Sequence, residues 1–153
     1  MDITSLHEKV LNKLRKYCAY QERSQQEVRD KLYDEGLHKN DVEACIAQLI
    51  SENFVNEERF AIAYAGGKFR IKQWGKVKIR LALKAKKVSD YCINKAIKEI
   101  SDKDYIKALH KNIDDYSKKV KEKDERKRKY KIAQHVISKG YEPDLVWNEL
   151  NME

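Results

Sequence analysis

The chain has 153 residues, 41% of them hydrophobic, and its 33 Lys and Arg against 25 Asp and Glu give a net charge of +8. This length suits one domain or a short array of small units, and one proline with five glycines is too few turn residues for a many-stranded sheet. No apolar run approaches the ~20 residues of a membrane span, and residues 1–4 lack the basic and apolar regions of a signal peptide, so we expect a cytoplasmic protein with no membrane partner.

The first predicted elements are three helices. Apolar residues at helical spacing predict an amphipathic helix from Thr4 to Tyr20. Ser24 and Glu27 have the spacing of a capping box, so a second helix begins there and ends at Gly36, a residue suited to a left-handed helix end. A third helix is predicted over residues 40–52. In the first helix, the apolar residues at this spacing are Leu6, Val10, Leu14 and Tyr17.

Six further helices follow the same scheme. Asn56 caps a helix that we expect to bend or fray at Gly66 and Gly67, since each glycine costs about 1 kcal/mol relative to alanine. Another helix follows Gly75, and Ser89 caps the next. The last three are marked by Ile106, Leu109, Ile113 and Tyr116, then by Ile132 and Val136, and then by Pro143 at a first helical turn.

Five positions recur twice along the chain, at offsets of 51 and 104 residues. A period near 50 residues indicates arrayed supersecondary units. We therefore predict an all-α fold, a tandem array of three three-helix repeats over residues 1–53, 54–101 and 102–153 that forms an elongated, curved molecule. The matched sets are Val28, Leu32, Gly36, Val42 and Ile46; Ile79, Leu83, Lys87, Ile93 and Ile97; and Ile132, Val136, Gly140, Val146 and Leu150.

Charge distinguishes the middle repeat from its neighbours. Residues 54–101 hold 12 cations and 4 carboxylates, net +8, whereas residues 1–53 carry −2 and residues 102–153 carry +2. We call residues 68–87 the basic segment, because it contains nine cations and no carboxylate. Its cations are Lys68, Arg70, Lys72, Lys76, Lys78, Arg80, Lys84, Lys86 and Lys87.

On a helix, Lys76, Arg80, Lys84 and Lys87 would form one column of like charges. A lysine-rich helix is ordinarily a solvated face, but twenty residues without an acid favour a polyanionic or acidic partner. Trp74 either stacks on nucleic-acid bases or, as is more usual at a helix start, anchors the packing. A second cationic stretch, residues 118–131, is interrupted by three carboxylates, which is typical of a solvent-exposed connection.

Catalytic and metal-binding motifs are missing from the sequence. The four histidines are dispersed, with no HExxH, zinc-spaced cluster, phosphate-binding loop or GxSxG elbow. We predict a protein that is not an enzyme and has no cofactor. The three cysteines, Cys18, Cys45 and Cys92, are too far apart for a CxxC motif, and we expect them to be reduced and mostly buried.

Three ordered motifs resemble those of the RecX family, the bacterial regulatory proteins of the RecA recombinase. Residues 22–36 resemble its R-S-x-x-E-L-x-x-K-L-x-x-K-G stretch, residues 54–64 its (F/Y)-hydrophobic-D-D-x-x-F-A-x-x-(Y/F) stretch, and residues 74–88 its W-G-x-x-(K/R)-I-x-x-x-L-x-x-K-G stretch. Two positions depart from the pattern: Asn56 replaces an acid, and Lys87 replaces a glycine that favours a left-handed turn.

The resemblance implies a modular helical protein whose basic surface binds in the groove of the RecA filament on single-stranded DNA. It would inhibit strand exchange, ATP turnover and coprotease activity, and so modulate recombination, DNA repair and the SOS response. We expect a monomer that contacts the filament, and DNA as a further partner, through Lys68, Arg70, Lys72, Trp74, Lys76, Lys78, Arg80, Lys84 and Lys87. The alternatives are a helical module that binds DNA or RNA directly and a scaffold that docks an acidic protein.

Overall fold

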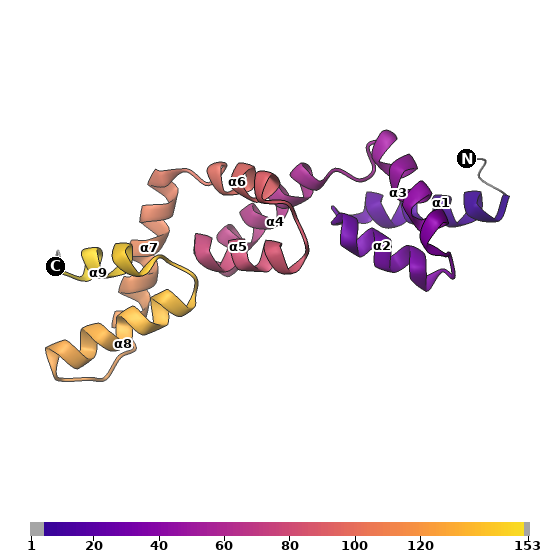
Figure 1. The fold of residues 1–153 in the computed structure, drawn as a ribbon. Helices are drawn as coiled ribbons and strands as arrows, with labels where there is room; N and C mark the ends of the chain where they lie inside the picture. Colours follow the sequence, from indigo (N-terminus) through magenta and orange to yellow (C-terminus); the bar gives the residue numbers. More distant parts are fainter. Residues whose placement is uncertain (1–4, 152–153) are drawn as a thin grey trace. The chain divides into compact units, whose positions relative to one another are not determined.

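The computed structural model describes residues 5–151, with side chains from His7 onward, so Thr4 and the Leu6 side chain lie outside it. Within these residues the chain forms nine α-helices and no strand (Figure 1), which confirms the all-α prediction. No helix in this part is long and apolar enough to cross a membrane. The helices are α1 (Ser5–Tyr20), α2 (Gln25–Asp34), α3 (Lys39–Ser51), α4 (Glu57–Lys72), α5 (Lys76–Ala85), α6 (Asp90–Lys98), α7 (Asp102–Ser117), α8 (Glu125–Ser138) and α9 (Pro143–Asn151).

The three predicted helix caps and the proline start of the last helix are confirmed. At each of three, a side-chain oxygen accepts a hydrogen bond from the backbone N–H three residues later, one of the amides that a helix leaves without a partner. Pro143 is the first residue of α9, as expected. The capping pairs are Ser24 with Glu27 (3.0 Å), Asn56 with Arg59 (2.9 Å) and Ser89 with Cys92 (3.3 Å).

The aligned helix ends share one backbone conformation. Gly36 and Gly140 have φ of +91° and +104°, and Lys87, which the same offset aligns with them, has φ of +63°. Lys87 therefore keeps the left-handed turn although a side chain there costs about 1 kcal/mol relative to glycine. This backbone conformation, shared by the three aligned positions, supports the internal repetition of the chain.

Helix α4 passes unbroken through its two glycines, so the prediction that it frays there is wrong. The adjacent Ala65 is fully buried, and that burial holds the helix in place. Gly66 also makes room for Arg70: a Cβ atom at Gly66 would lie 2.8 Å from the Arg70 guanidinium, whereas one at Gly67 would meet nothing within 4 Å.

The described residues divide into two compact units. The first comprises the residues up to Ala63 together with Leu83–Lys95, and the second comprises Tyr64–Ala82 with the residues from Ala96 onward. Helices α4, α5 and α6 each contribute to both. The three repeat boundaries and the elongated shape stay predictions.

In the first unit, α1, α2 and α3 pack around one apolar core. Leu11, Leu14, Leu32 and Leu49 are all fully buried in it. Within the described residues the three cysteines are buried and form no disulfide, as the sequence predicted. Burial raises the pKa of the Cys18 thiol to about 11, which keeps it protonated and unreactive at neutral pH.

In the second unit, α7, α8 and α9 pack together beside an aromatic cluster. The rings of Tyr105 and Tyr141 stack with centroids 5.2 Å apart, and Phe69 lies 6.0 Å from Tyr105. Burial raises the pKa of Tyr141 to about 12, and burial with a hydrogen bond to Glu142 raises the pKa of Tyr105. These buried hydroxyls are hydrogen-bonded and fix how α5 begins.

Candidate functional site

The start of α5 is capped by tertiary contacts rather than by a side chain of its own. The Gly75 N–H donates to the Lys139 carbonyl (2.8 Å), the Lys76 N–H to the Tyr105 hydroxyl (2.9 Å) and the Val77 N–H to the Gly140 carbonyl (2.9 Å). The two glycines touch so closely that a Cβ atom on Gly75 would lie 2.3 Å from the Gly140 backbone. Gly75 and the first residues of α5 therefore hold the start of this helix against the α8–α9 turn.

Trp74 lies between two lysines of the basic segment. The Nζ atoms of Lys68 and Lys78 are 4.9 Å and 4.7 Å from the indole ring, and the backbone N–H of Trp74 donates to the Lys68 carbonyl (3.1 Å). Each such cation–π contact contributes about 0.5–1 kcal/mol at an exposed site. The half-buried Trp74 therefore contacts two ammonium groups at the α4–α5 connection.

Lys76 was expected in a column of solvent-facing charges, but its side chain is mostly covered. Its side chain is only 19% exposed, and its Nζ lies 4.5 Å from the Tyr105 ring and 3.8 Å from a carboxylate oxygen of Asp102. The reason is helical drift, since residues four apart are turned by about 40° around the axis. Lys76 thus lies near the buried side of α5, and Lys84 is exposed.

Lys87 lies beyond the end of α5 at Ala85, so the predicted four-residue column contains only three residues of the helix. The Lys87 side chain is exposed, and Arg80 is half-buried. On α4, Arg70 and Lys72 are exposed, whereas Lys68 is half-buried against Trp74. The cations of the basic segment therefore lie on the end of α4, along α5 and directly after α5.

Carboxylates from elsewhere in the chain approach three cations of the segment. Besides Asp102 at Lys76, Asp90 lies 3.6 Å from Lys84, and Glu27 lies 3.3 Å from Lys86. The Lys84–Asp90 pair is exposed and contributes little to stability. Within the described residues, Lys68, Arg70, Lys72, Lys78 and Lys87 have no carboxylate at ion-pair distance.

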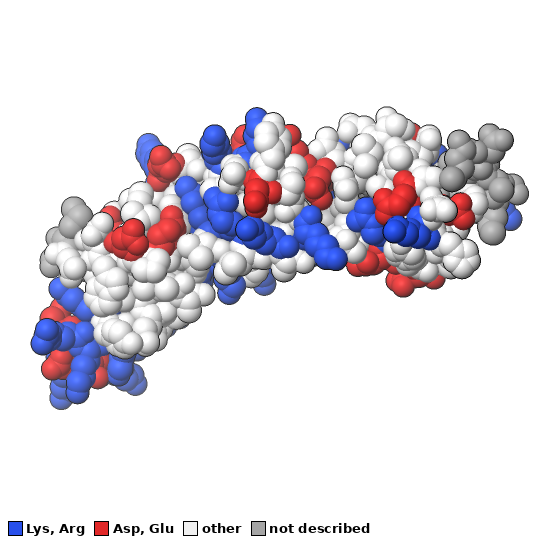
Figure 2. Space-filling view, viewed as in Figure 1, with Lys and Arg blue, Asp and Glu red and all other residues white. Residues whose placement is uncertain are grey.

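Exposed apolar residues accompany these cations. Val77 and Leu81 are one helical turn apart on α5 and are 41% and 64% exposed, and Ile71 on α4 is 79% exposed. Figure 2 shows blue side chains gathered over the middle helices with uncharged atoms among them. Such a surface combines charge with apolar area, which suits a macromolecular partner better than a small ion.

The second cationic stretch is a structural turn. Arg128 donates to the carbonyl oxygens of Ser117 and Val120, and Lys131 pairs with Glu122 at 3.1 Å. The Lys131 ammonium holds the pKa of the Glu122 carboxyl below its usual range. Figure 2 shows red among the blue at this α7–α8 turn, as the interspersed signs predicted.

The described residues contain no group of His, Cys, Asp and Glu that would hold a metal ion. A pocket beside the end of α4, which the sequence did not indicate, lies in the second unit and is lined by residues from three helices and their ends. Its residues lie far apart in the sequence, so no local pattern marks it.

Two family models match the chain. The first three-helix domain of RecX matches residues 11–49, and the second three-helix domain of RecX matches residues 56–97. The chain is 28% identical over 144 residues to the regulatory protein RecX of Clostridioides difficile, covering 94% of this chain and 67% of that protein. It is 27% identical over 130 residues to that of Bacillus licheniformis, covering 85% of this chain and 49% of the relative.

The fold also matches a solved structure. The crystal structure of RecX from Lactobacillus salivarius superposes with a TM-score of 0.85 at 24% identity, covering 97% of this chain and 98% of that one. The chain spans about half the length of the Bacillus relatives it matches. These proteins are regulatory proteins by name, and the two matched domains lie in the first and second predicted repeats.

Proposed function

Because the chain belongs to the RecX family of regulatory proteins, we propose that it binds the RecA recombinase filament on single-stranded DNA and inhibits it. Through this binding it modulates recombination, DNA repair and the SOS response. The proposal places the protein in the cytoplasm, as a monomer that acts by binding and catalyses no reaction itself.

The observation that supports this proposal best is the basic segment on the matched second domain. Its cations lie on α4, on α5 and directly after α5, and five of them have no carboxylate partner among the described residues. A filament on DNA presents phosphates and protein carboxylates together, and both attract such a surface. The exposed Val77 and Leu81 add apolar area for contact with protein.

The second candidate is a helical module that binds DNA or RNA directly. The pair of ammonium groups around Trp74 favours it, since cations beside an aromatic ring are typical of single-strand binding. If naked DNA is the partner, the logarithm of affinity falls with the logarithm of salt concentration, with a slope near −0.7 per phosphate contact on single strands. Tight binding to DNA without RecA would favour this candidate.

The test is the single-stranded-DNA-dependent ATPase activity of the cognate RecA, measured while this protein is added. The proposal predicts that ATP turnover falls as the protein is titrated to a few-fold excess. Undiminished turnover at several-fold excess would contradict it.

A charge-reversal variant locates the surface. Lys78→Glu, Arg80→Glu and Lys84→Glu together change three α5 residues, and Lys76 is left intact because it packs on Tyr105. The matched control reverses three exposed lysines of the first unit, Lys9, Lys16 and Lys39, with the same change in net charge. Equal loss of inhibition in both variants would indicate a general charge effect.

A further inference from the structure

A pocket of about 380 Å³ lies within the second unit, lined by the end of α4, by α7 with the turn after it, and by α8 with the turn after it. Three lysines line it, Lys72, Lys119 and Lys139, and the single carboxylate among its lining residues is Asp115. With His135 neutral the lining carries a net charge of +2. A concave site with this excess of positive charge favours an anion.

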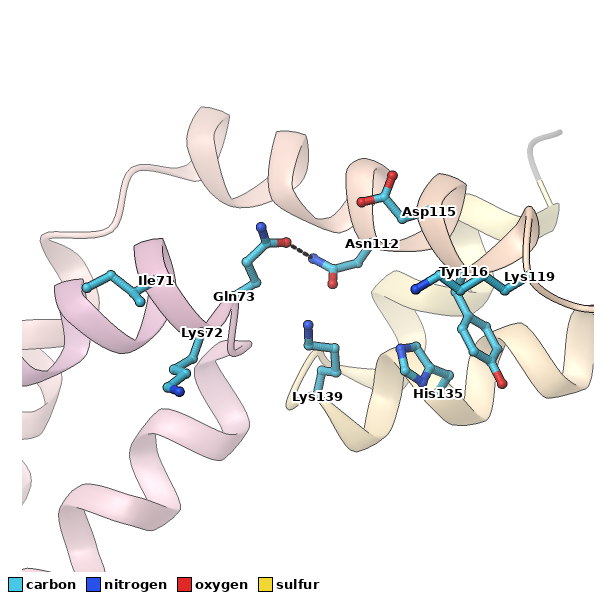
Figure 3. A pocket seen from close by; sticks show the side chains of 9 residues that line it. All are labelled: Ile71, Lys72, Gln73, Asn112, Asp115, Tyr116, Lys119, His135 and Lys139. Atoms are coloured by element: carbon cyan, nitrogen blue, oxygen red, sulfur yellow. Dashed lines mark hydrogen bonds between the residues drawn. The ribbon is translucent and has the colours of Figure 1, made fainter.

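Two ammonium groups converge in this pocket. Figure 3 shows the side chains of Lys119 and Lys139 extending toward the amide of Asn112, whereas the Lys72 side chain extends away from them. Neither Lys119 nor Lys139 forms an ion pair within the described residues. Asn112 is 6% exposed, and its Nδ2 donates to the Ala108 carbonyl at 2.8 Å, which fixes the amide at the pocket floor.

One wall of the pocket is an aromatic pair. The rings of Tyr116 and His135 stack with centroids 3.8 Å apart and planes 7° from parallel (Figure 3). Burial, and after it the charges of Lys139 and Lys119, lower the pKa of His135. The imidazole is thus neutral at neutral pH and faces an excess of positive charge, which an anion would reduce.

We infer that this pocket binds a phosphate group through Lys119, Lys139 and the His135 ring. Ammonium groups are common phosphate ligands, and the volume is within the usual range for small-molecule sites. The phosphate has two candidate sources, a free nucleotide or the backbone of a single-stranded nucleic acid. This inference goes beyond the proposed function, because it concerns a phosphate ligand that this chain would bind by itself, in the absence of RecA.

The experiment follows the imidazole resonances of His135 by NMR in the full chain, while inorganic phosphate, ATP or a short oligo-dT strand is added. The inference predicts saturable shifts and a higher His135 pKa with bound ligand, because an anion stabilises the protonated ring. Saturation by ATP but not by oligo-dT identifies a free nucleotide, and saturation by oligo-dT identifies backbone phosphate. Absence of saturable shifts with all three probes overturns the inference.

A double variant tests the two lysines. Lys119→Gln with Lys139→Gln keeps a polar side chain and removes both charges, so the Kd of the bound probe is expected to rise at least about tenfold. The matched control is Lys121→Gln with Lys123→Gln. These two lysines are exposed, lie in the α7–α8 turn that also holds Lys119, and do not line the pocket. Unchanged affinity in the first variant, or equal loss in both, overturns the inference. Far-UV circular dichroism verifies that both variants are folded.

Discussion

Replacing Gly75 by alanine tests the contact that fixes the start of α5. The new Cβ atom would lie 2.3 Å from the carbonyl carbon and oxygen of Gly140, well inside the roughly 3.5 Å of ordinary contact. Backbone therefore has to move, and the hydrogen bonds from Gly75 to Lys139 and from Val77 to Gly140 lengthen or break. At about 1 kcal/mol for each bond, with steric strain added, we expect a loss of about 2–4 kcal/mol in the free energy of unfolding.

The assay is urea unfolding followed by circular dichroism, with Gly67→Ala as the matched control. A Cβ atom at Gly67 meets nothing within 4 Å inside α4, so the control should gain about 0.5–1 kcal/mol through its better helix propensity. A loss in the free energy of unfolding for Gly75→Ala together with a gain for Gly67→Ala would support the close approach of Gly75 and Gly140. A Gly75→Ala protein as stable as the original chain would refute the reasoning.

Three further predictions concern stability. Ser24→Ala should lower the free energy of unfolding by about 1 kcal/mol, measured by urea unfolding, because it removes the cap on the Glu27 N–H. Lys87→Gly should raise it by up to about 1 kcal/mol in the same measurement by relieving the left-handed backbone, and a loss would contradict this. The pKa of Tyr141 is raised to about 12, so the folded state favours the protonated phenol. The free energy of unfolding should therefore keep its full value below about pH 10 and fall as the pH rises toward 12. Tyr141→Phe should reduce this fall in urea unfolding curves at alkaline pH, and the part of the fall that is due to Tyr105 should remain.

Local features of the fold were predictable because the atoms involved are close in sequence. A cap such as that of Ser24 joins groups three residues apart, and its spacing is visible in the printed chain. The repeat offsets likewise aligned Gly36, Lys87 and Gly140, which share a left-handed backbone. The fraying predicted at Gly66 failed because helix propensity is outweighed by tertiary burial of the same helix.

The surroundings of the basic segment were not predictable from the segment alone. It contains no carboxylate, yet the fold places Asp102 near Lys76 and Glu27 near Lys86. These partners lie 26 and 59 residues away in sequence. The Lys76 ammonium also faces the Tyr105 ring, a contact that depends on how α7 meets the start of α5.

The phosphate pocket depends on tertiary structure in the same way. Lys119 belongs to residues 118–131, which were interpreted as a solvent-exposed connection, and no motif of the sequence marks Lys139. Only the packing of α7 against α8 brings them together beside His135. The basic segment could thus be located from composition, whereas the pocket needed the fold.

We propose above all that the basic segment binds the RecA filament on single-stranded DNA. The most direct measurement compares RecA ATP turnover on single-stranded DNA with added wild-type protein, with the Lys78→Glu, Arg80→Glu and Lys84→Glu variant, and with the Lys9, Lys16 and Lys39 control. We predict that the wild-type protein and the control lower turnover and that the α5 variant does not. Turnover that stays constant with wild-type protein, or falls equally with the α5 variant, would contradict the claim.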